Sequence, residues 1–296
     1  MHRLFPNCAD VPYSCRTGLQ HTSEYERQAM RRIFLAVLLY VQVTTAQAQD
    51  SALVTLNTGD VSRGWEAVGR LDIDHAGFCT ASLIGETLIL TAAHCVFDDN
   101  GNLIAPDRFT FQAGLRDGRA VATRGVIRTT PHPDYIHRAD KARDDAVAAD
   151  LAVLELDRPV RQSRVIPYAI GASPLRGTHV AVVSYARDRA NAASLQQSCR
   201  VLQEARAIVV LTCAADFGAS GAPVFSLADG LPRIVSVISA KGTNKAESVS
   251  LATSLASPIV KLLTAHRAGQ APIITTAPRF ISSRNRNDTG AKFVRP

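Results

Sequence analysis

The sequence predicts an all-β fold, either a barrel or a sandwich, with one helix near its end. Short runs rich in Val, Ile, Leu and Thr recur along the chain, and Gly, Asp, Asn and Pro separate them at short intervals. With 296 residues, of which 46% are hydrophobic, the chain can bury one large core or two smaller ones. Many short strands between turns are typical of barrels and sandwiches.

The strands are expected at residues 67–73, 82–84, 88–91, 109–113, 121–127, 151–156, 179–185, 207–212, 223–226 and 234–240. A helix is expected at 257–267, because Ser257 and Pro258 supply a cap and a first-turn proline. Its apolar face would consist of Ile259, Val260, Leu262 and Leu263. Residues 268–296 contain few apolar side chains, which predicts a disordered tail.

The N-terminal part of the sequence has the layout of a secretory signal peptide. Two arginines follow Met30, an apolar run of about eleven residues comes next, and Ala46-Gln47-Ala48 forms a small-x-small cleavage site. A membrane span needs about 20 apolar residues, so a signal anchor is the less favoured alternative. We therefore interpret residues 1–29 as a mis-called leader and 30–48 as the signal peptide. The mature protein would begin at Gln49 and be secreted or periplasmic, without a membrane segment.

Export changes how the cysteines are interpreted. An even set of four, Cys79, Cys95, Cys199 and Cys213, lies in the mature chain, which favours disulfides in an oxidising compartment. The two local pairs, 79 with 95 and 199 with 213, would each close a loop worth roughly 3 kcal/mol of stability. Zinc is the alternative because His94 adjoins Cys95, but no C-x-x-C or H-x-x-x-H spacing supports it. No metal and no cofactor are expected.

The charge balance points to no special partner. The chain has 33 Lys and Arg residues against 26 Asp and Glu, a net charge of +7. Such an excess suits nucleic acid or an anionic surface, but no basic run is interleaved with aromatic residues. We interpret it as a solvated basic surface and expect no nucleic-acid partner.

Three short segments carry residues suited to acyl transfer. His94 ends an apolar run, Asp150 precedes another, and Ser220 lies in a loop of small residues at 216–223. Acyl transfer needs a nucleophile, a base to deprotonate it and an acid to orient the base. It also needs backbone amides aimed at the developing oxyanion, for which Gly218 leaves room. Each residue alone is weak evidence, and the case rests on their conjunction and their order His, Asp, Ser.

The segments at 78–85, 90–95 and 150–154 resemble those of chymotrypsin- and trypsin-like serine peptidases, in the style of the secreted bacterial members. The resemblance runs from about residue 65 to about residue 263. It implies two six-stranded antiparallel β-barrels, at 49–165 and 166–256, with the catalytic site in the cleft between them. Such a protein would be a serine endopeptidase acting on polypeptides. An esterase or lipase would have a different order of catalytic residues.

The resemblance also implies a role for each matching residue. His94 would be the general base, Asp150 would orient it, and Ser220 would attack the scissile carbonyl. The amides of Gly218 and Ser220 would form the oxyanion hole. A Cys79–Cys95 bridge would pin the histidine loop, whereas the bridge of Cys199 with Cys213 would lie closer to the serine than in trypsin.

The sequence departs from trypsin in the residues that set specificity. Ala214 stands where trypsin keeps the acid that selects Lys and Arg, and Asp216 is nearby but out of register. The substrate-pairing strand aligns with Ser239, Ala240 and Lys241. An unpaired buried charge is costly, so we expect poor cleavage after Lys and Arg, with small apolar or acidic side chains preferred.

A second departure concerns activation. Ala219 stands where zymogens of the family keep an aspartate that receives the new N-terminus. An ammonium buried against Ala219 would be unpaired, so residues 49–64 are expected to form a surface strand or a flexible leader. The alternative function is a catalytically inactive homologue that serves as a binding module. The oligomeric state is left open.

Overall fold

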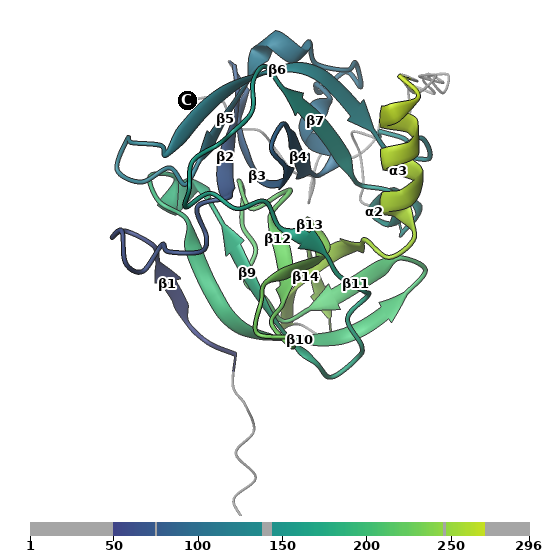
Figure 1. Ribbon diagram of the computed structural model, residues 1–296. Helices are drawn as coiled ribbons and strands as arrows, with labels where there is room; N and C mark the ends of the chain where they lie inside the picture. Colours follow the sequence, from purple (N-terminus) through teal and green to yellow (C-terminus); the bar gives the residue numbers. More distant parts are fainter. Residues whose placement is uncertain (1–49, 75, 138–143, 245–246, 270–296) are drawn as a thin grey trace, which may run out of the picture. The chain divides into compact units, whose positions relative to one another are not determined.

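The computed structural model describes residues 50–74, 76–137, 144–244 and 247–269 (Figure 1). The expected leader, the signal peptide and all but the start of the expected tail lie outside these residues. Two antiparallel barrels form the described chain, so the predicted fold is confirmed. Within the described residues, no helix is long and apolar enough to cross a membrane.

The first barrel is closed by six strands in the order β2-β3-β4-β7-β6-β5. Alternation of side chains builds its core: in β5, Phe109, Phe111 and Ala113 are buried and the residues between them are half-buried. The strands are β2 (Val68–Ile73), β3 (Gly77–Gly85), β4 (Leu88–Thr91), β5 (Phe109–Ala113), β6 (Ala122–Pro131) and β7 (Ala152–Leu156).

The second barrel follows the order β9-β10-β11-β14-β13-β12, and pairing of β12 with β9 closes it. Two short strands add to it: β8 (Ala169–Ile170) runs parallel to β13, and β1 (Leu53–Thr55) pairs with β10. The strands of the barrel are β9 (His179–Ser184), β10 (Ser194–Ala205), β11 (Ile208–Leu211), β12 (Pro223–Ser226), β13 (Arg233–Asn244) and β14 (Glu247–Ser254).

Strand β1 belongs to the sheet of the second barrel, although it lies within the range expected for the first. The amide of Ser51 donates to the carbonyl of Ser198 over 2.7 Å, and Leu53 pairs with Gln196. The segment that precedes the first barrel is therefore partly a surface strand. Its three residues are exposed, and a run this short carries no alternating pattern that predicts a strand.

The C-terminal helix α3 spans Pro258–Arg267, as expected, although the side chain of Ser257 makes no capping hydrogen bond. Ile259 and Leu262 pack into the same core as the first barrel. Near the end of the helix, Arg128 of β6 donates to the carbonyl of His266 over 2.9 Å. The helix thus returns the chain to the first barrel after the second is complete (Figure 1).

The structure joins both cysteine pairs, Cys79 with Cys95 and Cys199 with Cys213. The first bridge lies in the larger core cluster, which includes the first barrel, and the second lies in the core of the second barrel. A short helix that the sequence did not announce, α2 (Asp144–Ala148), immediately precedes Asp150.

Candidate active site

His94 and Asp150 are joined by two hydrogen bonds. The ring Nδ1 of His94 lies 2.7 Å from Oδ2 of Asp150, and the backbone amide of His94 donates to Oδ1 over 2.8 Å. His94 lies in the 3₁₀ turn η1 (Ala93–Val96) that follows β4, and Asp150 comes just before β7. Because β4 and β7 are paired strands, their ends bring the two residues together.

The two groups shift each other's pKa in opposite directions. Burial lowers the pKa of His94, but the charge and hydrogen bond of Asp150 outweigh that effect, so the pKa of His94 is raised. Burial raises the pKa of Asp150, but His94 and a hydrogen bond from Ser239 outweigh it, so the pKa of the carboxyl is lowered. Asp150, with 3% of its surface exposed, is an ionised group held in the interior by its donors.

Ser239, on strand β13 of the second barrel, is the third donor to the carboxylate of Asp150, after the backbone amide and the ring of His94. Its hydroxyl donates to Oδ2 of Asp150 over 2.5 Å, where the histidine ring also binds. Ser239 was expected to face the substrate, but the structure places its hydroxyl on the acid. The bond links β13 to the end of the first barrel.

The Ser220 loop lies against the histidine loop. The amide of Thr80 donates to the carbonyl of Ser220 over 2.8 Å, and Cys79, next in the chain, is bonded to Cys95 beside His94. A Cβ atom on Gly221 would come within 3.0 Å of the Ala92 amide, so the glycine permits this close approach. Contacts of neighbouring residues thus hold Ser220 and His94 in one region.

Thr80, which the sequence did not single out, connects the two barrels at this point. Its hydroxyl donates to the carbonyl of Gly218 over 2.9 Å and accepts from the amide of Tyr185 over 3.0 Å. Its own carbonyl accepts from the hydroxyl of Thr91 over 2.8 Å. Fully buried polar groups persist only when they are paired, and here the pairing fixes the Ser220 loop. A lone threonine in a strand gives no sequence signal of such a role.

The remaining ring nitrogen of His94, Nε2, is buried and has no hydrogen-bond partner among the described residues. The hydroxyl of Ser220 does not donate to it in this structure. An unpaired nitrogen of this kind is available to accept a proton, and such bonds commonly tighten only when substrate binds.

A hydrogen bond to its carbonyl orients the peptide unit between Phe217 and Gly218. That carbonyl accepts from the amide of Arg187 over 2.8 Å, and in a trans peptide the N–H points the opposite way. Gly218 adopts φ +95°, a conformation that suits glycine. Within the described part of the chain, the amides of Gly218 and Ser220 donate no hydrogen bond. Two free donors of one loop, separated by the paired amide of Ala219, are suited to binding an anionic oxygen.

An aromatic cluster that the sequence analysis missed lies near the pair of His94 and Asp150. The ring of Phe97 stacks on that of His137 at 5.2 Å and lies 5.6 Å from Tyr135. Burial, followed by the charge of Asp150, raises the pKa of Tyr135. Tyr135 and His137 are near neighbours in the sequence, but Phe97 lies 38 residues before Tyr135, so only the fold brings the cluster together.

A cavity of about 310 Å³ adjoins the Ser220 loop and contains two of the expected specificity residues. Ala214 and Lys241 both line it, whereas Ala240 pairs with Leu251 of β14 and is not part of the lining. Asp216 also lines the cavity. The structure therefore brings together Ala214, Asp216 and Lys241 but not the whole predicted set.

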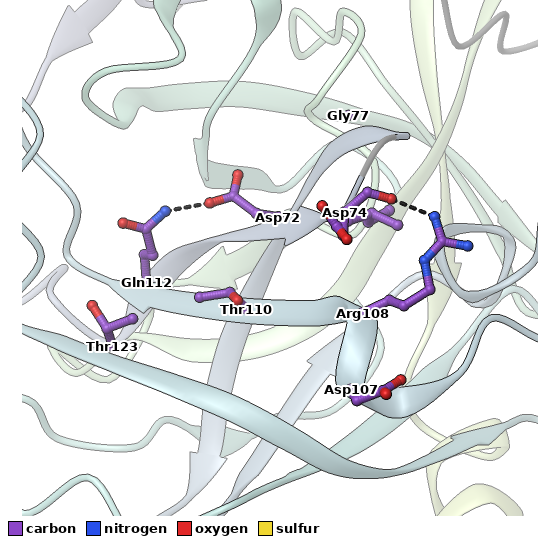
Figure 2. A pocket seen from close by; sticks show the side chains of 9 residues that line it. Asp72, Asp74, Gly77, Asp107, Arg108, Thr110, Gln112 and Thr123 are labelled. Carbon is purple, nitrogen blue, oxygen red and sulfur yellow. Dashed lines mark hydrogen bonds between the residues drawn. The ribbon is translucent and has the colours of Figure 1, made fainter.

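A larger hollow, of about 560 Å³, lies on the first barrel and contains no residue of the predicted triad. Figure 2 shows Asp72, Asp74 and Asp107 around it, with Gln112 donating to the carboxylate of Asp72 and Arg108 donating to the backbone carbonyl of Asp74. Arg70 also pairs with Asp72 over 2.7 Å. Gln112 and Arg70 thus satisfy the carboxylate of Asp72, and we assign the hollow no function.

The described residues contain one group close enough together to hold a metal ion: Cys79, His94 and Cys95. The two sulfurs are bonded to each other, so neither offers the thiolate that zinc binds. The geometry gives no support to the zinc alternative.

Comparison with known proteins agrees with this fold. Residues 77–231, just over half of the chain, match the family described as the trypsin-like peptidase domain. A bovine suppressor of tumorigenicity 14 protein homolog is 35% identical over 98 residues, which is 31% of this chain and 11% of that protein. Rabbit coagulation factor IX is 32% identical over 94 residues, 31% of each chain. The chain therefore spans less than a third of the length of these mammalian relatives.

Two solved structures have a similar fold at low identity. A structure of Glu endopeptidase has a TM-score of 0.59 and 18% identity, covering 75% of this chain and 98% of the other. An inactivated protease paralogue of the scabies mite has a TM-score of 0.57 and 12% identity over the same shares. The expected bacterial style stays a prediction. The matched family and the two barrels together show that the chain belongs to the trypsin-like peptidases.

Proposed function

We propose that this protein is a serine endopeptidase with His94, Asp150 and Ser220 as its triad. The observation that carries the proposal is the paired, half-buried His94, whose Nδ1 binds Asp150 at 2.7 Å while Nε2 is unpaired. An acid on one ring nitrogen selects the tautomer in which the other nitrogen accepts a proton. The contacts of the Ser220 loop with the histidine loop support Ser220 as the donor of that proton.

In the proposed reaction, Ser220 Oγ bonds to the scissile carbonyl carbon while its proton passes to Nε2 of His94. The carbonyl oxygen becomes an anion, which accepts hydrogen bonds from the amides of Gly218 and Ser220. His94 then protonates the departing amine, the C–N bond breaks, and an acyl-enzyme remains. Water hydrolyses the acyl group in the same way, giving its proton to His94, and Ser220 regains its hydrogen.

The oxyanion hole is proposed to exist without insertion of a new N-terminus. Ala219 is buried, with 1% of its surface exposed, and offers no charge to an ammonium group. The anchoring of Ser51 on β10 keeps the start of the described chain on the surface of the second barrel. The hydrogen bond from Arg187 to Phe217 instead orients the Gly218 amide. We also propose that the protein is exported, because its two disulfides suit an oxidising compartment.

A fluorophosphonate probe tests the proposal against the inactive-homologue alternative. The reagent is expected to label the wild-type protein at Ser220 and to leave Ser220→Ala unlabelled, because only an activated serine attacks phosphorus at a useful rate. Ser226→Ala, in β12, removes a serine outside the site and serves as the matched control. Intact-protein mass spectrometry followed by peptide mapping gives the answer. A folded wild-type protein that takes up no label would favour the binding module.

The activity is expected to fall at acidic pH, with its midpoint above 6.5, the ordinary pKa of histidine. The base must be neutral to accept the serine proton, and Asp150 raises the pKa of His94. The logarithm of kcat/KM, measured for a peptide substrate across pH 5 to 9, should therefore decline with a slope of one as the pH falls through that pKa. An acidic limb centred below pH 6.5 would contradict the assignment of His94.

A further inference from the structure

We propose that the cavity beside the Ser220 loop selects substrates with an acidic side chain, Glu or Asp, immediately before the scissile bond, and that Lys241 makes this selection. The inference rests on the proposed function. The cavity, of about 310 Å³, is large enough for one such side chain.

The position of the cavity follows from the turn that precedes the serine. The amide of Ala219 donates to the carbonyl of Asp216 over 2.9 Å, a tight turn that keeps Asp216 close to Ser220. Lys241 lies on β13, two residues after Ser239, whose hydroxyl binds Asp150. The cavity is therefore bounded on two sides by segments that also reach the triad.

The two carboxylates that line the cavity each hold a donor already. Oδ1 of Asp188 lies 3.1 Å from Nη1 of Arg189. Oδ1 of Asp216 accepts from the amide of Phe217 over 2.9 Å. Their negative charges are partly met within the protein, by a cation in the first case and a backbone dipole in the second.

The two basic residues that line the cavity, Arg189 and Lys241, in contrast keep hydrogen-bond donors without a partner among the described residues. Nε of Arg189 is buried and has no hydrogen-bond partner, although the other two nitrogens of that guanidinium bind Asp188 and Ser184. Lys241 forms no ion pair or side-chain hydrogen bond with any residue that the structure describes. The buried Nε of Arg189 costs free energy without a partner, which a ligand that accepts hydrogen bonds would recover, whereas Lys241 is an exposed cation free to pair with such a ligand.

The rest of the lining fits the methylene groups of such a side chain. Leu53 of β1 and the small residues Ala214 and Ala215 contribute to the wall. A Lys or Arg side chain would meet Lys241 and the unpaired part of Arg189 there, and the two carboxylates of the lining, Asp188 and Asp216, each hold a donor already. A carboxylate would bring the charge that the unused donors lack.

Four peptides test the inference, identical except for Glu, Gln, Lys or Leu before the cleaved bond. Wild-type kcat/KM is expected to be at least about tenfold higher for Glu than for Gln, because hydrogen bonds to a charged group are the stronger ones. Lys241→Met should bring that ratio close to one, and Lys241→Glu should shift the preference toward Lys. Lys261→Met removes a cation of α3 that is paired with Asp134, and it should leave the ratio unchanged.

The outcomes separate this inference from the function it rests on. Labelling of Ser220 by a fluorophosphonate with equal turnover of the Glu and Gln peptides would overturn the inference and leave the peptidase standing. A Glu preference that persists in Lys241→Met would overturn the role of Lys241. Absence of both labelling and cleavage would overturn the inference together with the proposed function.

Discussion

Replacing Asp150 by asparagine is expected to lower kcat/KM for a peptide substrate by roughly 10⁴-fold. The amide could still accept from the His94 backbone, as Oδ1 does now over 2.8 Å, so the loop geometry would survive. Its NH₂ group would then face Nδ1 of His94 and donate where the carboxylate accepts. The ring would be held in the other tautomer, with Nε2 protonated and unable to act as a base.

The control for this experiment is Asp134→Asn. Asp134 pairs with Lys261 on the surface at 2.6 Å, so its loss removes a carboxylate without touching the triad. This variant should keep wild-type turnover, and thermal unfolding of both variants shows whether either has lost its fold. An Asp150→Asn protein that is folded and turns over peptide at the wild-type rate would rule out the proposed triad.

Replacing Gly221 by alanine is expected to destabilise the protein by roughly 3–5 kcal/mol. A Cβ atom there would come within 2.1 Å of the Thr91 hydroxyl and 2.2 Å of the Thr80 carbonyl. These two groups are hydrogen-bonded to each other over 2.8 Å in the buried joint between the barrels. Neither can move without breaking that bond, and the positive φ of +80° adds backbone strain.

Gly230→Ala separates the two effects. Gly230 has nearly the same φ, +75°, but nothing lies within 4 Å of the added Cβ, so this variant carries the backbone strain alone. It should cost about 1–2 kcal/mol. Urea unfolding midpoints of the two variants give the comparison. Equal losses of unfolding free energy in the two variants would show that the close approach at Gly221 does not contribute to the destabilisation.

The strands that the sequence predicted are those with apolar side chains on the inner face. Strands β4, β5 and β12 begin and end at the expected residues, because their apolar runs are short and end at turns. Strand β10 was missed, because Ser194 and Gln196 occupy two of its four buried positions and interrupt the apolar pattern. The side chain of Gln196 is satisfied by donating to the Ser51 carbonyl, and such pairing cannot be read from the chain.

The residues of the proposed site likewise divide into those that the sequence could predict and those that only the fold reveals. His94, Asp150 and the Ser220 loop carry local motifs, so the sequence could nominate them. Thr80 has its role only because its hydrogen bonds with Ser220, Gly218 and Tyr185 join segments that are far apart in the chain. Ser239 was nominated for substrate but binds the acid, because a register shift in β13 falls at this residue.

The return of α3 to the first barrel has a consequence for the order in which the contacts of the proposed site are completed. Asp150 and His94 are synthesised long before Ser239, which donates to the acid, and before His266, which binds Arg128 and Thr130. A chain that has emerged only as far as the first barrel lacks both of these partners. Asp150 therefore receives its full set of donors only after β13 has been added, and β6 gains its contacts with His266 only after α3 has docked.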